Sequence, residues 1–207
     1  MTGQAKAGAR PIARADRRAA VAALVAAFWD YPETLHLLPD ERRRRLVLPR
    51  YLAGDCADSQ PHDTLLGVTV EGELAGVAAW LPPGAYPIPA GRQVTQVLHL
   101  LPALPWGIGA AREARNGQRA NRAHHPREPH WFLRAVGVVP HRQRKGLGRA
   151  LLVPVLDRAD DAGVGCYLTT AEAANVGYYE RFGFAVRATF RPTSTWPQVW
   201  AMWRDPC

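Results

Sequence analysis

The stretch QRKGLGRALL, from Gln143 to Leu152, contains three cationic side chains, two glycines one residue apart and then an apolar run. The preceding residues HWFLRAVGVVP are typical of a buried strand that stops at Pro140, and the residues from Gly148 onward are typical of a helix. At the start of a helix the backbone N–H groups lack partners and the dipole is positive. Because glycine has no Cβ, a ligand can approach this backbone closely. The stretch therefore predicts a cradle for a pyrophosphate between a strand and a helix.

Two common phosphate-binding loops do not fit this stretch. A P-loop requires a glycine, four residues and then Gly-Lys followed by Ser or Thr, and that spacing is absent. A Rossmann loop requires a third glycine, where this chain has Leu151. It also requires an acid after the next strand, and that strand ends in Thr169 and Thr170. The remaining structural alternative is a basic helix start that holds no ligand.

Length, composition and charge limit the class of protein. A chain of 207 residues, with 47% hydrophobic and 21% charged residues, suits one globular domain over residues 1–207. The net charge of +8 suits nucleic acid, a membrane surface or a small polyanion equally well. Three cysteines far apart indicate a reducing compartment. No apolar run is long enough to cross a bilayer, so we expect a cytoplasmic protein without a membrane partner.

The order of the expected elements indicates a mixed α/β fold. Residues 15–32 are expected to form a helix capped by Asp16 and ended by Pro32, and a second helix follows from about residue 40. A hairpin is expected around Glu71 and Gly72, before a basic helical region that extends to about Arg122. The rest of the chain predicts strand, helix, strand, helix, strand and a final strand.

Two motifs together resemble those of the GNAT family of N-acetyltransferases. VVPHRQRKGLGRALL matches the family's acyl-CoA motif, in which a strand and a proline precede Gln or Arg, two residues, Gly, one residue, and Gly or Ala. NVGYYERFGF matches the later family segment. The matching residues of this segment are Asn175, Tyr179, Glu180, Gly183 and Phe184. The two motifs occur in the family's order, about thirty residues apart.

The resemblance implies a fold, a cofactor and a reaction. We expect a central mixed sheet that is splayed between two parallel strands and flanked by helices. We also expect acetyl-CoA as co-substrate and the primary amine of a small molecule as acceptor. Three stretches, AAFWDYPETLH, HHPREPHWFLRAVGVVP and YYERFGF, are similar to family members that acetylate the antibiotic puromycin, an aminonucleoside. The similarity covers most of the chain and is weakest between about Arg42 and Arg122.

The resemblance also implies roles for individual residues. The splayed strands would be residues 133–139 and 164–170, and the backbone of Val136, Gly137 and Val138 would hold the pantetheine arm and face the thioester oxygen. Tyr179 would protonate the leaving thiolate, because a phenol has a pKa near that of a thiol. The remaining residues expected at the cofactor are Gln143, Arg144, Lys145, Gly146, Leu147, Gly148, Arg149 and Asn175. A core aromatic is the alternative for Tyr179, and a helix N-cap the alternative for Asn175.

The general base is where the sequence departs from its relatives. Thr169 stands where the puromycin-acetylating relatives have a glutamate, and a threonine cannot act as a carboxylate base. Glu172 is the candidate base, directly or through a water, with a surface glutamate as the alternative. Without a base, an α-amino acceptor would react more readily than an ε-amine, because a larger fraction of it is neutral near pH 7.

Other residue patterns leave the acceptor and the class of function open. The seven histidines show no metal-ligand spacing, so no metal site is expected. Trp29, Trp80 and Trp106 are candidates for an aromatic acceptor pocket. Acetylation of a protein N-terminus or lysine, a non-catalytic acyl-CoA sensor and a nucleic-acid-binding module that uses the arginines remain alternatives. Clustering of cations at one loop favours a small ligand over nucleic acid. Monomer and homodimer are both compatible with the sequence.

Overall fold

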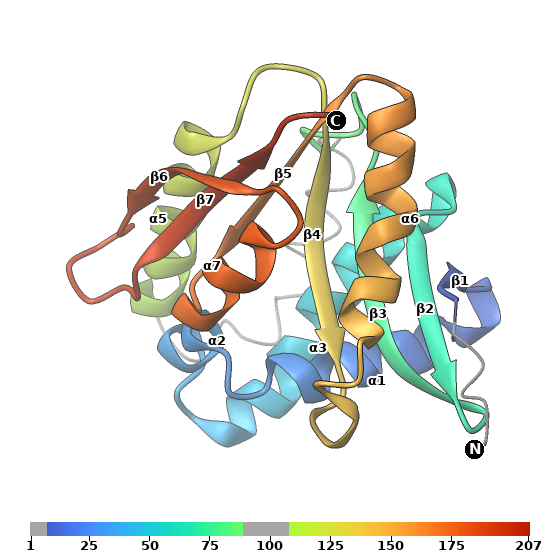
Figure 1. The fold of residues 1–207 in the computed structure, drawn as a ribbon. Coiled ribbons are helices and arrows are strands. Elements are labelled where there is room, and N and C mark those ends of the chain that lie inside the picture. The colour runs from blue at the N-terminus through green and yellow to red at the C-terminus, as the bar shows by residue number, and fades with distance from the viewer. Residues whose placement is uncertain (1–7, 89–107) are drawn as a thin grey trace.

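The fold was obtained as a computed structural model that describes residues 8–88 and 108–207 (Figure 1). Its strands are β1 (Arg10–Pro11), β2 (Leu65–Val70), β3 (Glu73–Leu81), β4 (His130–Val138), β5 (Gly165–Thr170), β6 (Ala185–Phe190) and β7 (Val199–Arg204). Its α-helices are α1 (Arg17–Phe28), α2 (Pro32–Leu37), α3 (Glu41–Ser59), α5 (Ile108–His124), α6 (Leu147–Asp161) and α7 (Ala173–Glu180). Short 3₁₀ turns occupy Arg14–Asp16, Gln60–His62 and Pro140–Arg142.

The strands form one mixed sheet in the order β1-β2-β3-β4-β5-β7-β6. The central neighbours β4 and β5 are parallel, and the other neighbouring strands described are antiparallel. Helices α1 and α3 cover one face of the sheet, whereas α6 covers the other (Figure 1). The α/β fold with a central mixed sheet flanked by helices is therefore confirmed.

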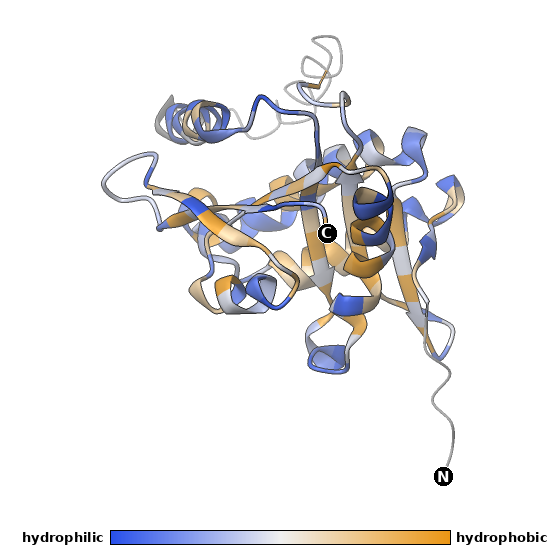
Figure 2. Ribbon diagram, turned by 45° about the horizontal axis from the view of Figure 1, so that its top comes forward, coloured by the Kyte–Doolittle hydropathy of each residue, from blue (hydrophilic) through white to orange (hydrophobic). Residues whose placement is uncertain are grey.

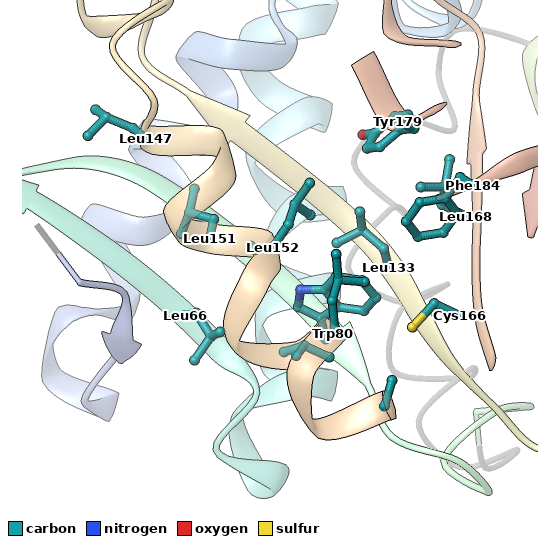
Figure 3. Packing of buried hydrophobic residues seen from close by; sticks show 14 of the residues in the cluster. Leu66, Trp80, Leu133, Leu147, Leu151, Leu152, Cys166, Leu168, Tyr179 and Phe184 are labelled. Atoms are coloured by element: carbon teal, nitrogen blue, oxygen red, sulfur yellow. The ribbon is translucent and has the colours of Figure 1, made fainter. Parts of the chain in front are cut away.

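Alternating side chains explain why both faces of the sheet are covered. On β2, Leu65 packs into the cluster beneath α1 and α3, whereas Leu66 packs into the cluster beneath α6. Successive strand residues point to opposite faces, so an uninterrupted apolar run produces a strand buried on both sides. Leu151 and Leu152 of α6 pack over Trp80 in the second cluster (Figure 3). Helix α6 directs its hydrophobic residues toward the sheet and hydrophilic ones outward (Figure 2).

The two parallel strands separate halfway along their length. The β4–β5 ladder joins His130–Leu133 to Gly165–Leu168 and ends there, after which β4 stays paired with β3 and β5 with β7. At this point the β3–β4 register shifts between Ala79 and Trp80, which leaves Arg134 as an extra residue on β4. A bulge of this kind bends and twists the strand that contains it. The expected splay is thus present, and it begins at Arg134.

Several local expectations can be compared with the structure. The β2–β3 hairpin is confirmed, and its turn residues Glu71 and Gly72 have φ values of 55° and 82°, as a tight hairpin turn requires. The expectation for Pro32 is wrong, because α1 ends at Phe28 and Pro32 begins α2. Proline suits a first helical position, where its missing N–H is not needed. Asp16 precedes α1 but its side chain forms no capping hydrogen bond.

Candidate active site

The glycine loop leads directly into the first turn of α6. Gly146 occupies the N-cap position with φ 79°, a conformation that glycine adopts without cost, and no side chain caps the helix. The first N–H groups of α6 therefore remain available to an anion. Arg144, Lys145 and Arg149 are exposed around them. The start of α6 thus has the local geometry and the charge expected of the cradle, and the binding of a pyrophosphate there stays a prediction.

Neighbouring side chains fix the position of this loop. The Gln143 Nε2 group donates a hydrogen bond of 3.1 Å to the carbonyl oxygen of Val138, so the loop is tied to the end of β4. Arg142 forms an ion pair with Glu71 at the β2–β3 turn, and this contact lowers the pKa of the exposed Glu71 carboxyl. Leu147 is buried in the core beneath α6 and anchors the first turn of the helix.

The part of β4 beyond the splay has one edge that β5 does not use. Val136 and Val138 pair with β3, and their side chains pack toward α6. At Gly137 a Cβ atom would lie 2.5 Å from the Ala27 Cβ, so this glycine lets α1 pack closely against β4. The valine side chains and the missing side chain of Gly137 thus serve the packing of the fold, while the backbone edge that faces the gap remains available to a ligand.

Tyr179 lies on α7 and is buried at the edge of the core (Figure 3). Its ring centroid is 5.9 Å from that of Phe184 and 5.4 Å from that of Tyr178. Burial raises the pKa of the phenol well above its usual value, and the neighbouring Tyr31 and Tyr178 add to this shift. The phenol is therefore protonated at neutral pH, which is the state that a general acid requires.

The hydroxyl of Thr170, at the end of β5, joins three segments of the chain. It lies 3.2 Å from the Tyr31 hydroxyl and accepts hydrogen bonds of 3.3 Å from the Asn175 Nδ2 group and the Glu172 backbone N–H. The Tyr31 hydroxyl also accepts a hydrogen bond of 2.5 Å from the Ala171 backbone N–H. These bonds attach the α1–α2 connection to the start of α7.

Glu172 and Asn175 form local hydrogen bonds that the sequence did not predict. Glu172 is the N-cap of α7, where its carboxylate accepts a hydrogen bond of 3.4 Å from the Ala174 backbone N–H. Asn175 lies inside α7, and its amide points to Thr170. The N-cap alternative for Asn175 is therefore wrong, since Glu172 occupies that position.

Glu33 is a carboxylate of the site that the sequence did not single out. Its Oε1 atom accepts a hydrogen bond of 3.3 Å from the indole Nε1 of Trp196. Burial raises the pKa of this carboxyl, while the Trp196 hydrogen bond and nearby His36 act in the opposite direction. The charge of Glu33 also raises the pKa of the Tyr31 phenol, after the larger effect of burial. Glu33 therefore acts electrostatically on the residue that contacts Thr170.

Three distant segments meet around Glu33. The Nε2 atom of His36 lies 3.4 Å from the Glu113 carboxylate of α5, and this carboxylate also accepts a hydrogen bond of 3.1 Å from Thr193. The His36 ring lies 4.8 Å from the Trp196 ring. We call this region the acceptor side, after the role that we propose for it below: it comprises the α1–α2 connection, α2, α5 and the β6–β7 loop.

A buried ion pair lies at the bulge where β4 leaves β5. Arg134 contacts Asp55 of α3, and the Asp55 side chain is 3% exposed. Burial raises the pKa of Asp55, and the charge of Arg134 opposes that shift. Buried pairs of this kind are costly to break because the remaining charge stays uncompensated. The pair therefore fixes the bulge relative to α3.

The two candidate tryptophans that the structure describes, Trp29 and Trp80, pack in different clusters and do not line a common pocket. Trp80 is fully buried in the core beneath α6, and Trp106 lies outside the described residues. Trp29 lies 5.0 Å from the Arg44 guanidinium, which also donates to the Trp29 carbonyl oxygen. The indole beside Glu33 is instead that of Trp196. Arg44 is itself buried, so the arginine run of α3 is not a uniformly solvated face.

The missed residues have weak signals in the sequence. Tyr31 and Glu33 stand in the stretch AAFWDYPETLH, whose similarity to known relatives was visible without assigning either residue a role. Trp196 lies in a connection between two C-terminal strands and shows no motif. Only the fold brings it to Glu33, across 163 positions of sequence.

Comparison with known proteins decides the family. Residues 21–184 match the acetyltransferase (GNAT) family. The chain belongs to this family. It is 25% identical over 191 residues to an uncharacterised N-acetyltransferase of Schizosaccharomyces pombe, with 85% of this chain and 73% of the relative covered.

Solved structures show the same fold at low sequence identity. A structure described as histone acetyltransferase HPA2 and related acetyltransferase, from Corynebacterium glutamicum, gives a TM-score of 0.68 at 24% identity, covering 97% of this chain and 96% of the other. The PaiA N-acetyltransferase of Thermoplasma acidophilum, solved in complex with coenzyme A, gives 0.56 at 14% identity, covering 95% and 97%.

The chain is thus a GNAT N-acetyltransferase, and acetyl-CoA is its co-substrate. The uncapped start of α6 and the unused edge of β4 fit a pyrophosphate and a pantetheine arm. Among residues 8–88 and 108–207, no group of three or more His, Cys, Asp or Glu side chains could hold a metal ion. No helix in these same ranges is long and apolar enough to cross a membrane.

Proposed function

We propose that this enzyme, acting as one catalytic domain over residues 1–207, transfers the acetyl group of acetyl-CoA to the primary amine of a small molecule. The observation that supports the acceptor position is the contact between Tyr31 and Thr170. It joins the acidic acceptor side to the end of β5, where the strands part and the cofactor arm is expected. The amine would approach from the Glu33 side and meet the acetyl group at the splay.

Glu33 is the proposed general base. An aliphatic ammonium has a pKa of about 10.4, so it must lose a proton before its nitrogen can attack. Burial raises the pKa of the Glu33 carboxyl, which brings its basicity closer to that task. Glu172 remains the base predicted from the sequence. Its carboxylate caps α7, and we propose this capping as its main role.

Tyr179 is the proposed proton donor to the departing sulfur. Burial raises the pKa of the phenol, so it keeps its proton until negative charge develops on the sulfur, and we expect the proton to pass to the thiolate as the C–S bond breaks. Acetyl-CoA supplies the activated acyl group when bound. The backbone of Val136, Gly137 and Val138 would orient it along the unused edge of β4. A backbone N–H on this edge would stabilise negative charge on the carbonyl oxygen.

The cradle residues would hold the nucleotide end of the cofactor. The N–H groups of Leu147, Gly148 and Arg149 at the start of α6 suit a pyrophosphate. Arg144 and Lys145 add positive charge at the exposed rim of the loop. Gln143 orients the loop through Val138, and Asn175 acts through Thr170.

The acceptor proposed first is an amine with an aromatic group. Trp196, His36 and Tyr31 surround Glu33, so an aromatic ring would find apolar contacts beside the carboxylate. Puromycin, an aminonucleoside, is the first compound to try, and its acetylation in the cytoplasm would give antibiotic resistance. If Glu33 is the base, ε-amines would be acceptors as well, whereas the preference for α-amino groups that Thr169 suggests stays the prediction for an enzyme without a carboxylate base.

A thiol-release assay with acetyl-CoA tests this function. The amine panel contains puromycin, aromatic and aliphatic primary amines, and peptides with a free N-terminus or a lysine. We expect release with at least one small amine and none above background with the peptides. Turnover of peptides only would replace the proposed acceptor with a protein. Binding of acetyl-CoA without release for any amine would favour a sensor.

A further inference from the structure

Tyr178 places an unpartnered hydroxyl next to the cofactor loop. Its Oη atom is buried and has no hydrogen-bond partner among the described residues. A Cβ atom added to Gly148 would lie 2.4 Å from this Oη atom. The phenol therefore fills the space that the missing side chain of Gly148 leaves beside the first turn of α6. This differs from the sequence expectation, in which that space was left for the ligand alone.

The surroundings of the Tyr178 ring are aromatic and cationic. The ring packs 5.2 Å from the ring of Phe182, and the Arg181 guanidinium lies 5.2 Å from the Tyr178 ring. The guanidinium of Arg149 lies 6.0 Å from the Phe182 ring. Both arginines are exposed. An anion that binds at the start of α6 would thus meet two exposed cations and one buried neutral donor.

The phenol keeps its proton at neutral pH. Burial raises the pKa of Tyr178, while Arg181 and Arg149 act against that shift. A buried hydroxyl without a partner destabilises a folded protein, and a phenylalanine in the same place would avoid that cost. A tyrosine here is explained if a ligand completes its hydrogen bond.

We infer that the Tyr178 hydroxyl donates a hydrogen bond to a pyrophosphate oxygen of bound acetyl-CoA. The inference rests on the proposed cofactor loop. A Cβ on Gly148 would meet the Tyr178 hydroxyl, so this hydroxyl lies beside the first turn of α6, whose N–H groups have no side-chain cap. A pyrophosphate held by those N–H groups would lie close enough to accept from the phenol as well. The two adjacent tyrosines then have different roles, since Tyr178 binds the nucleotide end of the cofactor and Tyr179 acts at the thioester.

Titration calorimetry with Tyr178→Phe tests this assignment, because the substitution keeps the ring and removes only the hydroxyl. We expect the affinity for CoA to fall roughly 10–100-fold, as for a lost hydrogen bond to a charged group. Dephospho-CoA, which lacks the 3′-phosphate but keeps the pyrophosphate, should lose affinity by the same factor. The melting temperature of the ligand-free variant should equal or exceed that of the wild type.

The matched control is Tyr167→Phe. Tyr167 lies on β5, and its phenol donates to the carbonyl oxygen of His124, away from the loop. Its removal should leave the affinity for CoA unchanged.

Each other outcome has a definite meaning. Unchanged CoA affinity in Tyr178→Phe, or a clear fall in its ligand-free melting temperature, would contradict the inference. A loss seen with CoA but not with dephospho-CoA would move the contact to the 3′-phosphate and overturn the assignment to the pyrophosphate. If the wild type binds neither compound, the proposed cofactor loop itself is wrong.

Discussion

The cofactor side and the acceptor side of this enzyme are built in opposite ways. The cofactor side consists of the end of β4, the loop and the start of α6, which are contiguous in the chain and rich in arginine and lysine. The acceptor side joins residues 77, 139 and 163 positions apart, in the pairs His36–Glu113, Tyr31–Thr170 and Trp196–Glu33. Its charged groups around Trp196 include two carboxylates, Glu33 and Glu113.

This difference shows which kinds of site can be found in a sequence. A site made from backbone N–H groups needs a fixed local geometry, and that geometry imposes glycines at fixed spacing. A site made from side chains needs only that they meet in space. The cofactor can therefore be inferred from a motif, whereas the residues that we propose at the acceptor become visible only in the fold.

The largest expected effect is on the chemical step, where the two sides meet. Tyr179→Phe removes the proposed proton donor and keeps the ring, so kcat should fall by roughly 10²–10⁴-fold. The affinity for acetyl-CoA should change little, because the cradle is intact. Steady-state thiol release and calorimetry measure the two quantities. A variant with near-native kcat would show that water or another group protonates the sulfur.

Particular residues show how far prediction from the sequence reached. The strand–loop–helix unit around Gly146 and the hairpin at Gly72 were predictable, because turn residues and apolar runs specify them locally. The splayed sheet was expected only from the resemblance to the GNAT family. The role of Pro32 was predicted wrongly, since proline can follow one helix or begin the next. Glu33 and Trp196 were not predictable, because no local pattern links positions so far apart.

A smaller effect, on the affinity for CoA, is expected when a negative charge is added to the cofactor loop. Gly146 is exposed, and no heavy atom lies within 4 Å of the position a Cβ would take. Asp tolerates a left-handed conformation and is favourable at a helix N-terminus, so Gly146→Asp should fold. It should bind CoA about tenfold or more weakly, because its carboxylate repels the pyrophosphate.

Gly146→Asn is the control for this charge, since it has nearly the same shape without the negative charge. It should bind CoA more tightly than Gly146→Asp, and the difference should shrink at high salt. Equal CoA affinities for the two variants in calorimetry would mean that no anion binds at this position.

The smallest expected effect is on stability in weak acid, and it concerns a pair of histidines at the start of β4. The Nε2 atoms of His125 and His130 lie 3.1 Å apart, and burial, with His130 and Arg134, lowers the pKa of His125 to about 4. In the unfolded chain the His125 imidazole takes up a proton near pH 6.5, whereas in the folded protein it stays neutral down to about pH 4. The free energy of unfolding should therefore fall as the pH drops from about 6.5 to about 4.

Thermal unfolding across this pH range measures that slope. His125→Gln should make the slope shallower, whereas His141→Gln, at an exposed residue of the cofactor side, should leave it unchanged. A slope that responds equally to both substitutions would mean that the low pKa of His125 does not cause it.

The most direct test of the account is the pH dependence of kcat/KM in the wild type, Glu33→Gln and Glu172→Gln. Burial raises the pKa of Glu33 above 4.5, so the wild-type rate should decline in acid at a higher pH than for an ordinary glutamate. We predict that Glu33→Gln loses this acidic limb together with roughly 10²–10⁴-fold of the rate, and that Glu172→Gln keeps both. A Glu33→Gln variant with a near-native profile, beside an inactive Glu172→Gln, would contradict the account and make Glu172 the base.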